Sequence, residues 1–113
     1  MKKIEAIIKP FKLSQVKDSL HELGISGMTL VDVKGFGRQR GSTGGIDNDD
    51  NYDDEFLAKM KLEVIVEDNQ VEAVIDSIKS SAYSGKIGDG KIFLSNIERV
   101  IRIRTGEKDS EAV

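Results

Sequence analysis

The stretch KMKLEVIVEDNQVEAVIDSIKSSA, residues 59–82, contains the pattern that decides the fold. Polar and apolar side chains alternate from Met60 to Val66, which is typical of a strand with one buried face. Asp68 or Asn69 is then the predicted cap of a helix. The apolar side chains of this helix recur at helical spacing: Val71, Val74, Ile75, Ile78 and Ala82. The stretch therefore predicts a strand followed by an amphipathic helix.

The same unit occurs earlier in the chain, and each copy is completed by a further strand. Residues 3–8, KIEAII, alternate as a strand, Ser14 is the predicted cap of the helix that follows, and residues 28–34, MTLVDVK, form the next strand. After the second helix come two predicted strands, KIFLSNI at 91–97 and RVIRIRT at 99–105. This repetition predicts an α+β, ferredoxin-like double βαβ fold with one antiparallel sheet and two helices on one face. The uncovered sheet face leads us to expect self-association.

Composition limits the class of protein. A chain of 113 residues is predicted to form one domain, residues 1–113. It has no Cys, which excludes disulfides and thiol chemistry, and no apolar run long enough for a stable membrane insertion, so we expect a cytoplasmic protein. Residues 47–55 hold six of the 20 acids, which leaves 14 acids against 17 bases elsewhere. The charge pattern indicates a body that handles anions and an acidic segment that avoids them.

Two segments lack periodicity. Residues 38–55 form a loop that is long for a compact domain, and such loops are normally functional. The polar tail, at about residues 106–113, is expected to be flexible.

Residues 84–94, SGKIGDGKIFL, are the first candidate for a binding site. The glycines allow a tight turn whose amide N–H groups can approach an anion, and Lys91 adds positive charge. Arg102 and Arg104 lie two residues apart in the last predicted strand, so they share a face and form a fork for phosphate oxygens. Together with Arg38 after a second glycine hinge, these side chains indicate a polyphosphate ligand. The site would be built from both halves of the repeat or from two subunits.

Other site types find less support. KGFG, residues 34–37, matches the start of an RNA-recognition signature but lacks the aromatic residues that stack bases, so no nucleic-acid partner is expected. The acidic run begins like a calcium loop, but Tyr52 stands where glycine is needed and Ala58 where the bidentate glutamate belongs. The only His, His21, lies mid-helix, and nothing specifies a nucleophile, so the chain is not expected to be an enzyme.

Five motifs, in this order, resemble the PII nitrogen-regulatory signal-transduction proteins over nearly the whole chain. They are MKKIEAIIKPFKL at 1–13, GISGMT at 24–29, KGFGRQRG at 34–41, SGKIGDGKIFL at 84–94 and RVIRIRTGE at 99–107. The family's second signature is intact from Ser84 to Phe93. The resemblance implies a homotrimer whose sheets face inward, with ATP or ADP in each of three clefts between subunits.

The resemblance also implies roles for individual residues. The nucleotide-binding residues would be Ile7, Thr29, Gly35, Gly37, Arg38, Gln39, Ile65, Gly88, Asp89, Gly90, Lys91, Arg102 and Arg104. Gln39 would help to hold Mg²⁺ with the ATP phosphates, and Gln39 and Lys59 would bind the effector 2-oxoglutarate.

The loop at about 38–55 corresponds to the family's T-loop, which contacts target proteins. Tyr52 has the spacing of the family's uridylylated tyrosine, although its neighbours differ. The loop here is acidic, GIDNDDNYDDEF at 45–56, so we expect a target with a basic surface.

The resemblance therefore implies a regulator of nitrogen and carbon metabolism that senses ATP or ADP and 2-oxoglutarate and acts by binding proteins. A divergent paralogue that senses adenylate nucleotides alone is the first alternative. A small phosphate-handling enzyme on the same fold is the second, although KPFKLS at 9–14 offers no glycine cradle. A scaffold without a ligand is the third, and the Lys91, Arg102 and Arg104 cluster argues against it.

Overall fold

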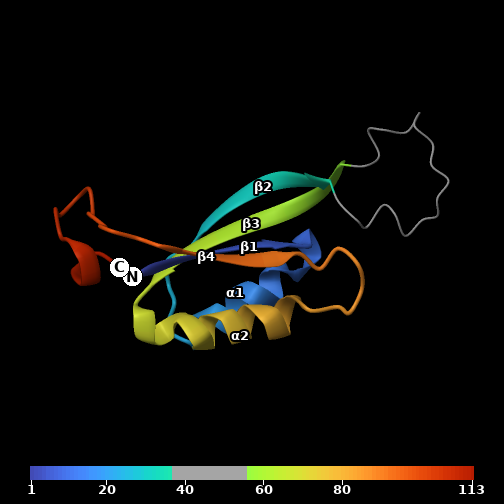
Figure 1. Cartoon of the computed structure of the whole chain (residues 1–113), viewed down its shortest axis with the longest axis horizontal. Coiled ribbons are helices and arrows are strands. Elements are labelled where there is room, and N and C mark those ends of the chain that lie inside the picture. Colours follow the sequence, from blue (N-terminus) through green and yellow to red (C-terminus); the bar gives the residue numbers. More distant parts are fainter. Residues whose placement is uncertain (37–55) are drawn as a thin grey trace.

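The computed structural model describes residues 1–36 and 56–113 and shows a four-stranded sheet with two helices on one face (Figure 1). The elements follow in this order: β1 (Lys2–Ile8), η1 (Pro10–Lys12), α1 (Leu13–Glu22), β2 (Thr29–Phe36), β3 (Phe56–Val66), η4 (Asp68–Gln70), α2 (Val71–Ala82), β4 (Lys91–Asn96) and η5 (Asp109–Glu111). The strand order is β2-β3-β1-β4, and every pairing is antiparallel. The predicted α+β, ferredoxin-like fold is confirmed.

The core lies between the sheet and the two helices, as the alternation in the sequence predicts. Every second side chain is buried on β1 from Ile4 and on β3 from Leu62, and both of these side chains are fully buried. The helices meet them with one apolar stripe each, in which Val16, Leu20 and Ile78 are completely inaccessible. Burial of these side chains supplies the main driving force for folding.

The helix starts differ from the predicted caps. Residues Pro10–Lys12 form a 3₁₀ turn in which the Lys12 amide donates to the Lys9 carbonyl at 3.0 Å, and α1 continues directly from this turn. Ser14 therefore lies inside α1 and does not cap it, because Pro10 starts the helical backbone earlier. Asp68 and Asn69 likewise lie within η4 rather than at a cap of α2.

The predicted strand at 99–105 is wrong. Ile101 makes one isolated bridge, to Lys108, and the Arg102 amide donates to the Glu107 carbonyl at 2.8 Å. The chain leaves the sheet after β4, so among the described residues this segment pairs only with residues 106–109 and forms a small projecting hairpin (Figure 1). The side chain of Ile103 in its turn is 99% exposed.

Helices cover one sheet face, and charged side chains occupy the middle of the other, which we call the open face. Glu5 on β1 lies directly opposite Glu63 on β3. Lys3 and Lys61 flank this pair, with the Lys3 Nζ 3.5 Å from a Glu5 oxygen and the Lys61 Nζ 3.7 Å from a Glu63 oxygen. These four side chains are only about one quarter to one third exposed.

Two aromatic rings hold together the ends of β2 and β3. Phe36 and Phe56 are paired in register, and their ring centroids lie 5.3 Å apart. Such a tilted ring contact stabilises the strand pair at its last position.

No helix in the described part of the chain is long and apolar enough to span a membrane.

Candidate anion-binding site

The loop from Ser84 to Gly90 joins α2 to β4 and is fitted closely against β1. Gly85, Gly88 and Gly90 all have positive φ angles, a region that side chains disfavour. At Gly90 an added Cβ would lie 1.6 Å from the Ile7 carbonyl oxygen, so only glycine can occupy this position. The loop is therefore anchored on the last residues of β1.

The carboxylate of Asp89 organises the same loop from inside. It accepts hydrogen bonds from the backbone amides of Ser84 at 2.8 Å and Gly85 at 2.9 Å, and from the Ser84 hydroxyl. The ammonium of Lys9 lies 3.2 Å from it. Burial alone would raise the pKa of Asp89, but these hydrogen bonds outweigh burial and hold the pKa well below its usual range.

A cavity of about 620 Å³ lies between this loop and the open face of the sheet, and we call it the candidate pocket. It is lined by Ile7, Gly35, Phe36, Lys59, Ile87, Gly88, Asp89, Gly90, Lys91 and Phe93. Seven of the residues predicted from the sequence are thus brought together: Ile7, Gly35, Lys59, Gly88, Asp89, Gly90 and Lys91. Glycines, two lysines and apolar side chains in one cavity suit a ligand with an anionic part and an apolar part.

Lys59 is the buried cation of the candidate pocket. Its side chain is only 6% exposed, and its Nζ donates to the Gly88 carbonyl at 2.7 Å. Burial and the nearby charge of Lys9 lower the pKa of Lys59, while Asp89 opposes this shift. A buried ammonium gains strongly from an anionic partner, because it has already lost most of its hydration. Lys59 therefore makes this end of the pocket suited to a negatively charged group.

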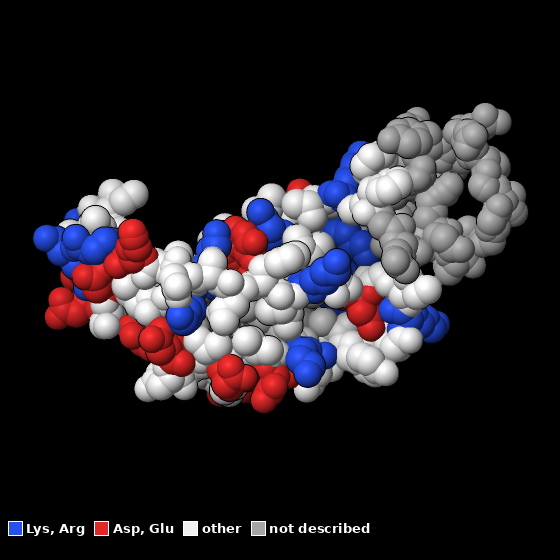
Figure 2. Space-filling model, viewed as in Figure 1, with Lys and Arg blue, Asp and Glu red and all other residues white. Residues whose placement is uncertain are grey.

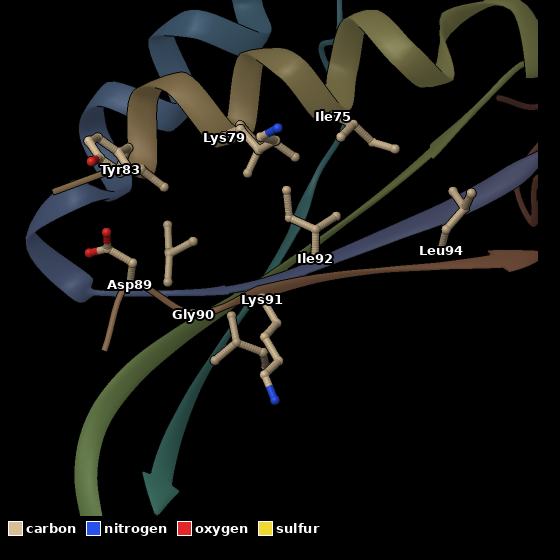
Figure 3. A pocket seen from close by; sticks show the side chains of 12 residues that line it. Ile75, Lys79, Tyr83, Asp89, Gly90, Lys91, Ile92 and Leu94 are labelled. Atoms are coloured by element: carbon tan, nitrogen blue, oxygen red, sulfur yellow. The ribbon is translucent and has the colours of Figure 1, made fainter. Parts of the chain in front are cut away.

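A second, apolar cavity of about 390 Å³ lies on the helix side of the sheet (Figure 3). Ile75 and Lys79 from α2 and Ile92 and Leu94 from β4 line it. In Figure 3 the Asp89 carboxylate points to this side, toward Tyr83, whereas Lys91 points to the opposite side of the sheet. The Lys91 side chain thus lies on the side of the candidate pocket, and the Asp89 carboxylate lies on the other side of the loop.

Comparisons with known proteins agree with this architecture. The family model described as "Nitrogen regulatory protein P-II" matches residues 1–107. Proteins of that name from Microchaete diplosiphon and Azospirillum brasilense are 58% and 55% identical over 113 residues, which is the full length of both chains in each case. The chain belongs to the P-II family. A crystal structure of Arabidopsis thaliana PII bound to citrate matches with a TM-score of 0.82 and 42% identity, over 99% of this chain and 91% of that one.

Membership of the P-II family makes this chain a nitrogen-regulatory signal-transduction protein and not an enzyme, since its relatives carry the name of a regulator. The resemblance stated from the sequence motifs is thereby confirmed. The phosphate-handling enzyme is excluded by the same comparisons.

Four residues predicted for the P-II site lie away from the candidate pocket. Thr29 begins β2, Ile65 is paired with Lys3 at the start of β1, and Arg102 and Arg104 lie in the projecting hairpin. Figure 1 shows this end of the molecule, near both termini, opposite the end that carries the loop before β4. Gly37, Arg38, Gln39 and Tyr52, with the rest of the predicted loop, lie outside the described residues. The structure thus divides the predicted residues that it describes between two ends of the molecule.

Several residues in and around the candidate pocket were missed by the sequence analysis. Lys9 and Ser84 support the loop from behind, and Phe36, Ile87 and Phe93 line the pocket. Alternation on β4 could have identified Phe93, because it shares a strand face with Lys91. Nothing in the sequence marks Lys9, whose partner Asp89 is 80 residues away and is reached only through the fold.

Proposed function

We propose that this P-II protein is a cytoplasmic homotrimer that binds ATP or ADP, with Mg²⁺, and 2-oxoglutarate between subunits, and controls target proteins through residues 38–55. The observation that carries the proposal is the candidate pocket, where a glycine turn meets Lys91 and the buried Lys59. Its volume lies within the range of about 300–1,000 Å³ that is usual for small-molecule sites. In Figure 2 several Lys and Arg side chains lie toward this end of the sheet, which favours anionic ligands.

The placement of the predicted residues supports a site between subunits. One group lines the candidate pocket, and the second group, Thr29, Ile65, Arg102 and Arg104, lies at the other end of the molecule. In a closed ring, one end of each chain meets a different end of the next. Such a ring would bring the arginines of one chain to the Lys91 of its neighbour. It would also cover the exposed Ile103 and the open face.

The acidic effector would bind at Lys59. The crystal structure of the Arabidopsis protein contains citrate, a carboxylate ligand, and we infer that this P-II protein binds a carboxylate as well. Lys59 is the buried cation of the pocket, so it is our candidate for a carboxylate of 2-oxoglutarate. Gln39, just beyond the end of β2, would hold Mg²⁺ together with the ATP phosphates.

Output would follow from the position of the pocket at the base of the loop. Gly35 and Phe36 line the pocket at the end of β2, directly before the segment that leads to β3. Ligands that contact these residues would favour different arrangements of the following segment, and target proteins would bind one of them better than another. The acidic residues of this segment lead us to propose a target with a basic surface.

Calorimetric titration tests the ligands. We expect one ATP per chain in the presence of Mg²⁺, and we expect ATP and 2-oxoglutarate to tighten each other's binding by the same factor, as linkage requires. If ATP binds but 2-oxoglutarate adds nothing, the protein is the adenylate-only paralogue. Absence of ATP binding would overturn the proposal.

Mixing of two variants tests the site between subunits. Lys91→Met and Arg102→Met damage opposite halves of the proposed site, so each homotrimer should bind ATP poorly. Trimers reassembled from both variants should regain strong sites, at the contacts where both halves are intact. If the pocket were complete within one chain, mixing would restore nothing.

A further inference from the structure

A cluster of three polar side chains lies behind the loop that precedes β4, outside the ligand-facing groups of the candidate pocket. Lys9, the first residue after β1, has a side chain that is 18% exposed. Its Nζ lies 3.2 Å from an oxygen of Asp89 and donates to the Ser84 hydroxyl oxygen at 3.0 Å. We call Lys9, Ser84 and Asp89 the clasp.

The clasp holds three successive backbone amides of the loop. The amides of Ser84 and Gly85 donate to the Asp89 carboxylate, and the Lys86 amide donates to the Ser84 hydroxyl oxygen at 3.3 Å. Ser84 also donates to Asp89. The first half of the loop is thereby fixed by one carboxylate and one hydroxyl, and both of these groups contact the ammonium of Lys9.

The second half of the loop is the part that faces a ligand. Gly88, Gly90 and Lys91 line the candidate pocket, and Gly90 is pressed against the Ile7 carbonyl. Asp89 lies between these two glycines. Its side chain belongs to the clasp, and its backbone belongs to the pocket. A change at the clasp must therefore change the position of the glycines on either side of Asp89.

Lys9 also determines how Asp89 acts on a bound anion. Asp89 lies between two glycines of the pocket, and although its carboxylate points to the helix side, an uncompensated charge so close to the pocket would repel phosphate or carboxylate ligands. The ammonium of Lys9 compensates this charge at ion-pair distance. Lys59 also contacts the loop, but its Nζ donates to the Gly88 carbonyl and not to Asp89.

We propose that Lys9 is a positioning residue of the nucleotide site, which holds the loop at residues 84–90 through Asp89 and Ser84 and neutralises the Asp89 carboxylate behind the pocket. The inference rests on the proposed nucleotide binding and adds a residue that contacts no ligand itself. Its role requires both the charge and the hydrogen bonds, so arginine should replace it and methionine should not.

The test compares three variants of the full chain: Lys9→Met, Lys9→Arg and, as a matched control, Lys12→Met. Lys12 lies three residues further along at the same end of the molecule, so its replacement removes the same charge without removing a clasp contact. Binding of ATP without Mg²⁺ is measured by calorimetry. We expect Lys9→Met to weaken binding about tenfold, as for a lost charge-assisted hydrogen bond, and Lys9→Arg and Lys12→Met to stay within about threefold of wild type.

Amide hydrogen exchange supplies a readout that needs no ligand. In Lys9→Met the amides of Ser84, Gly85 and Lys86 should exchange several-fold faster, while core amides such as that of Leu62 stay unchanged. Lys9→Gln, which keeps a donor without the charge, is the second variant if Lys9→Met does not fold.

Three outcomes decide the proposal. Unchanged ATP affinity in Lys9→Met would overturn it, and so would an equal loss in Lys12→Met, because the effect would then be one of general charge. If wild type binds no ATP, the proposed function fails. Even if wild type binds no ATP, faster amide exchange in Lys9→Met would support the role of Lys9 in positioning the loop. Unchanged amide exchange would refute that role.

Discussion

Gly90→Ala is the substitution whose effect the structure determines most directly. The added Cβ would lie 1.6 Å from the Ile7 carbonyl oxygen and 2.8 Å from the Ile7 carbonyl carbon, whereas real Cβ contacts are essentially never below 3.0 Å. Both neighbours are backbone atoms, so no side-chain rotation can relieve the clash. The start of β4 must move away from the end of β1 by about 1.4 Å, the difference between the first and the limiting distance.

The cost has two parts. Alanine at a φ of +99° costs about 1–2 kcal/mol in backbone conformation. Separation of the strands also breaks the pairing of Ile7 with Lys91 at the end of the β1–β4 ladder, at about 1 kcal/mol for each lost hydrogen bond. We therefore expect a loss of about 3 kcal/mol in unfolding free energy, which lowers Tm by about 12 °C in a chain of this size.

Thermal and urea unfolding followed by circular dichroism, at one fixed protein concentration, measures this loss. Gly24→Ala is the matched control, because Gly24 has a similar φ of +86° but no atom within 4 Å of an added Cβ. The control should lose only the conformational part, about 1 kcal/mol. If both variants lose the same stability, the close contact between the loop and β1 is not present and the reasoning is refuted.

Three further predictions concern the pocket and the core. Lys91→Met should weaken ATP binding about tenfold in calorimetry, because Lys91 lines the pocket with an exposed side chain. The midpoint of urea unfolding should stay unchanged. A shifted midpoint would mean that Lys91 has a structural role. Asp89 has a depressed pKa in the folded state, so its stabilisation is complete above the usual carboxyl pKa and is lost as the pH falls below about 4. The stability difference between wild type and Asp89→Asn in urea should therefore shrink from pH 7 to pH 3, and a constant difference would contradict the assigned hydrogen bonds. Leu62→Ala, at a completely buried position, should lose about 2–5 kcal/mol in urea unfolding, whereas Leu30→Ala, at a side chain that is 42% exposed, should lose less than half as much.

The fold could be predicted because its signals are local and repeated. Alternation on β1 and β3 and the apolar stripe of α2 each depend on near neighbours, and the structure buries those side chains. The glycine turn before β4 could be predicted for the same reason, because its glycines and lysines all lie between Gly85 and Lys91.

What could not be predicted depends on contacts between distant segments. The alternation in RVIRIRT indicates a strand, but a strand needs a partner, and among the described residues this segment finds only the short stretch after it. Ser14 has the chemistry of a cap, yet Pro10 starts the helical turn before it. Lys9 belongs to the site through a contact with Asp89 that no local pattern reveals.

The ring contact between Phe36 and Phe56 limits how far the chain can extend from this end of the molecule. Residues 37–55 are 19 in number, and both neighbours of this segment are fixed at one register position. A chain that must leave and return to the same point can place its midpoint at most about 30 Å away, half of its fully extended length. A target protein that binds this segment would therefore bring its binding surface within that radius of the phenylalanine pair, and Phe36, one of that pair, also lines the candidate pocket. Any target that binds the segment is held within a few nanometres of the groups that would sense the metabolites.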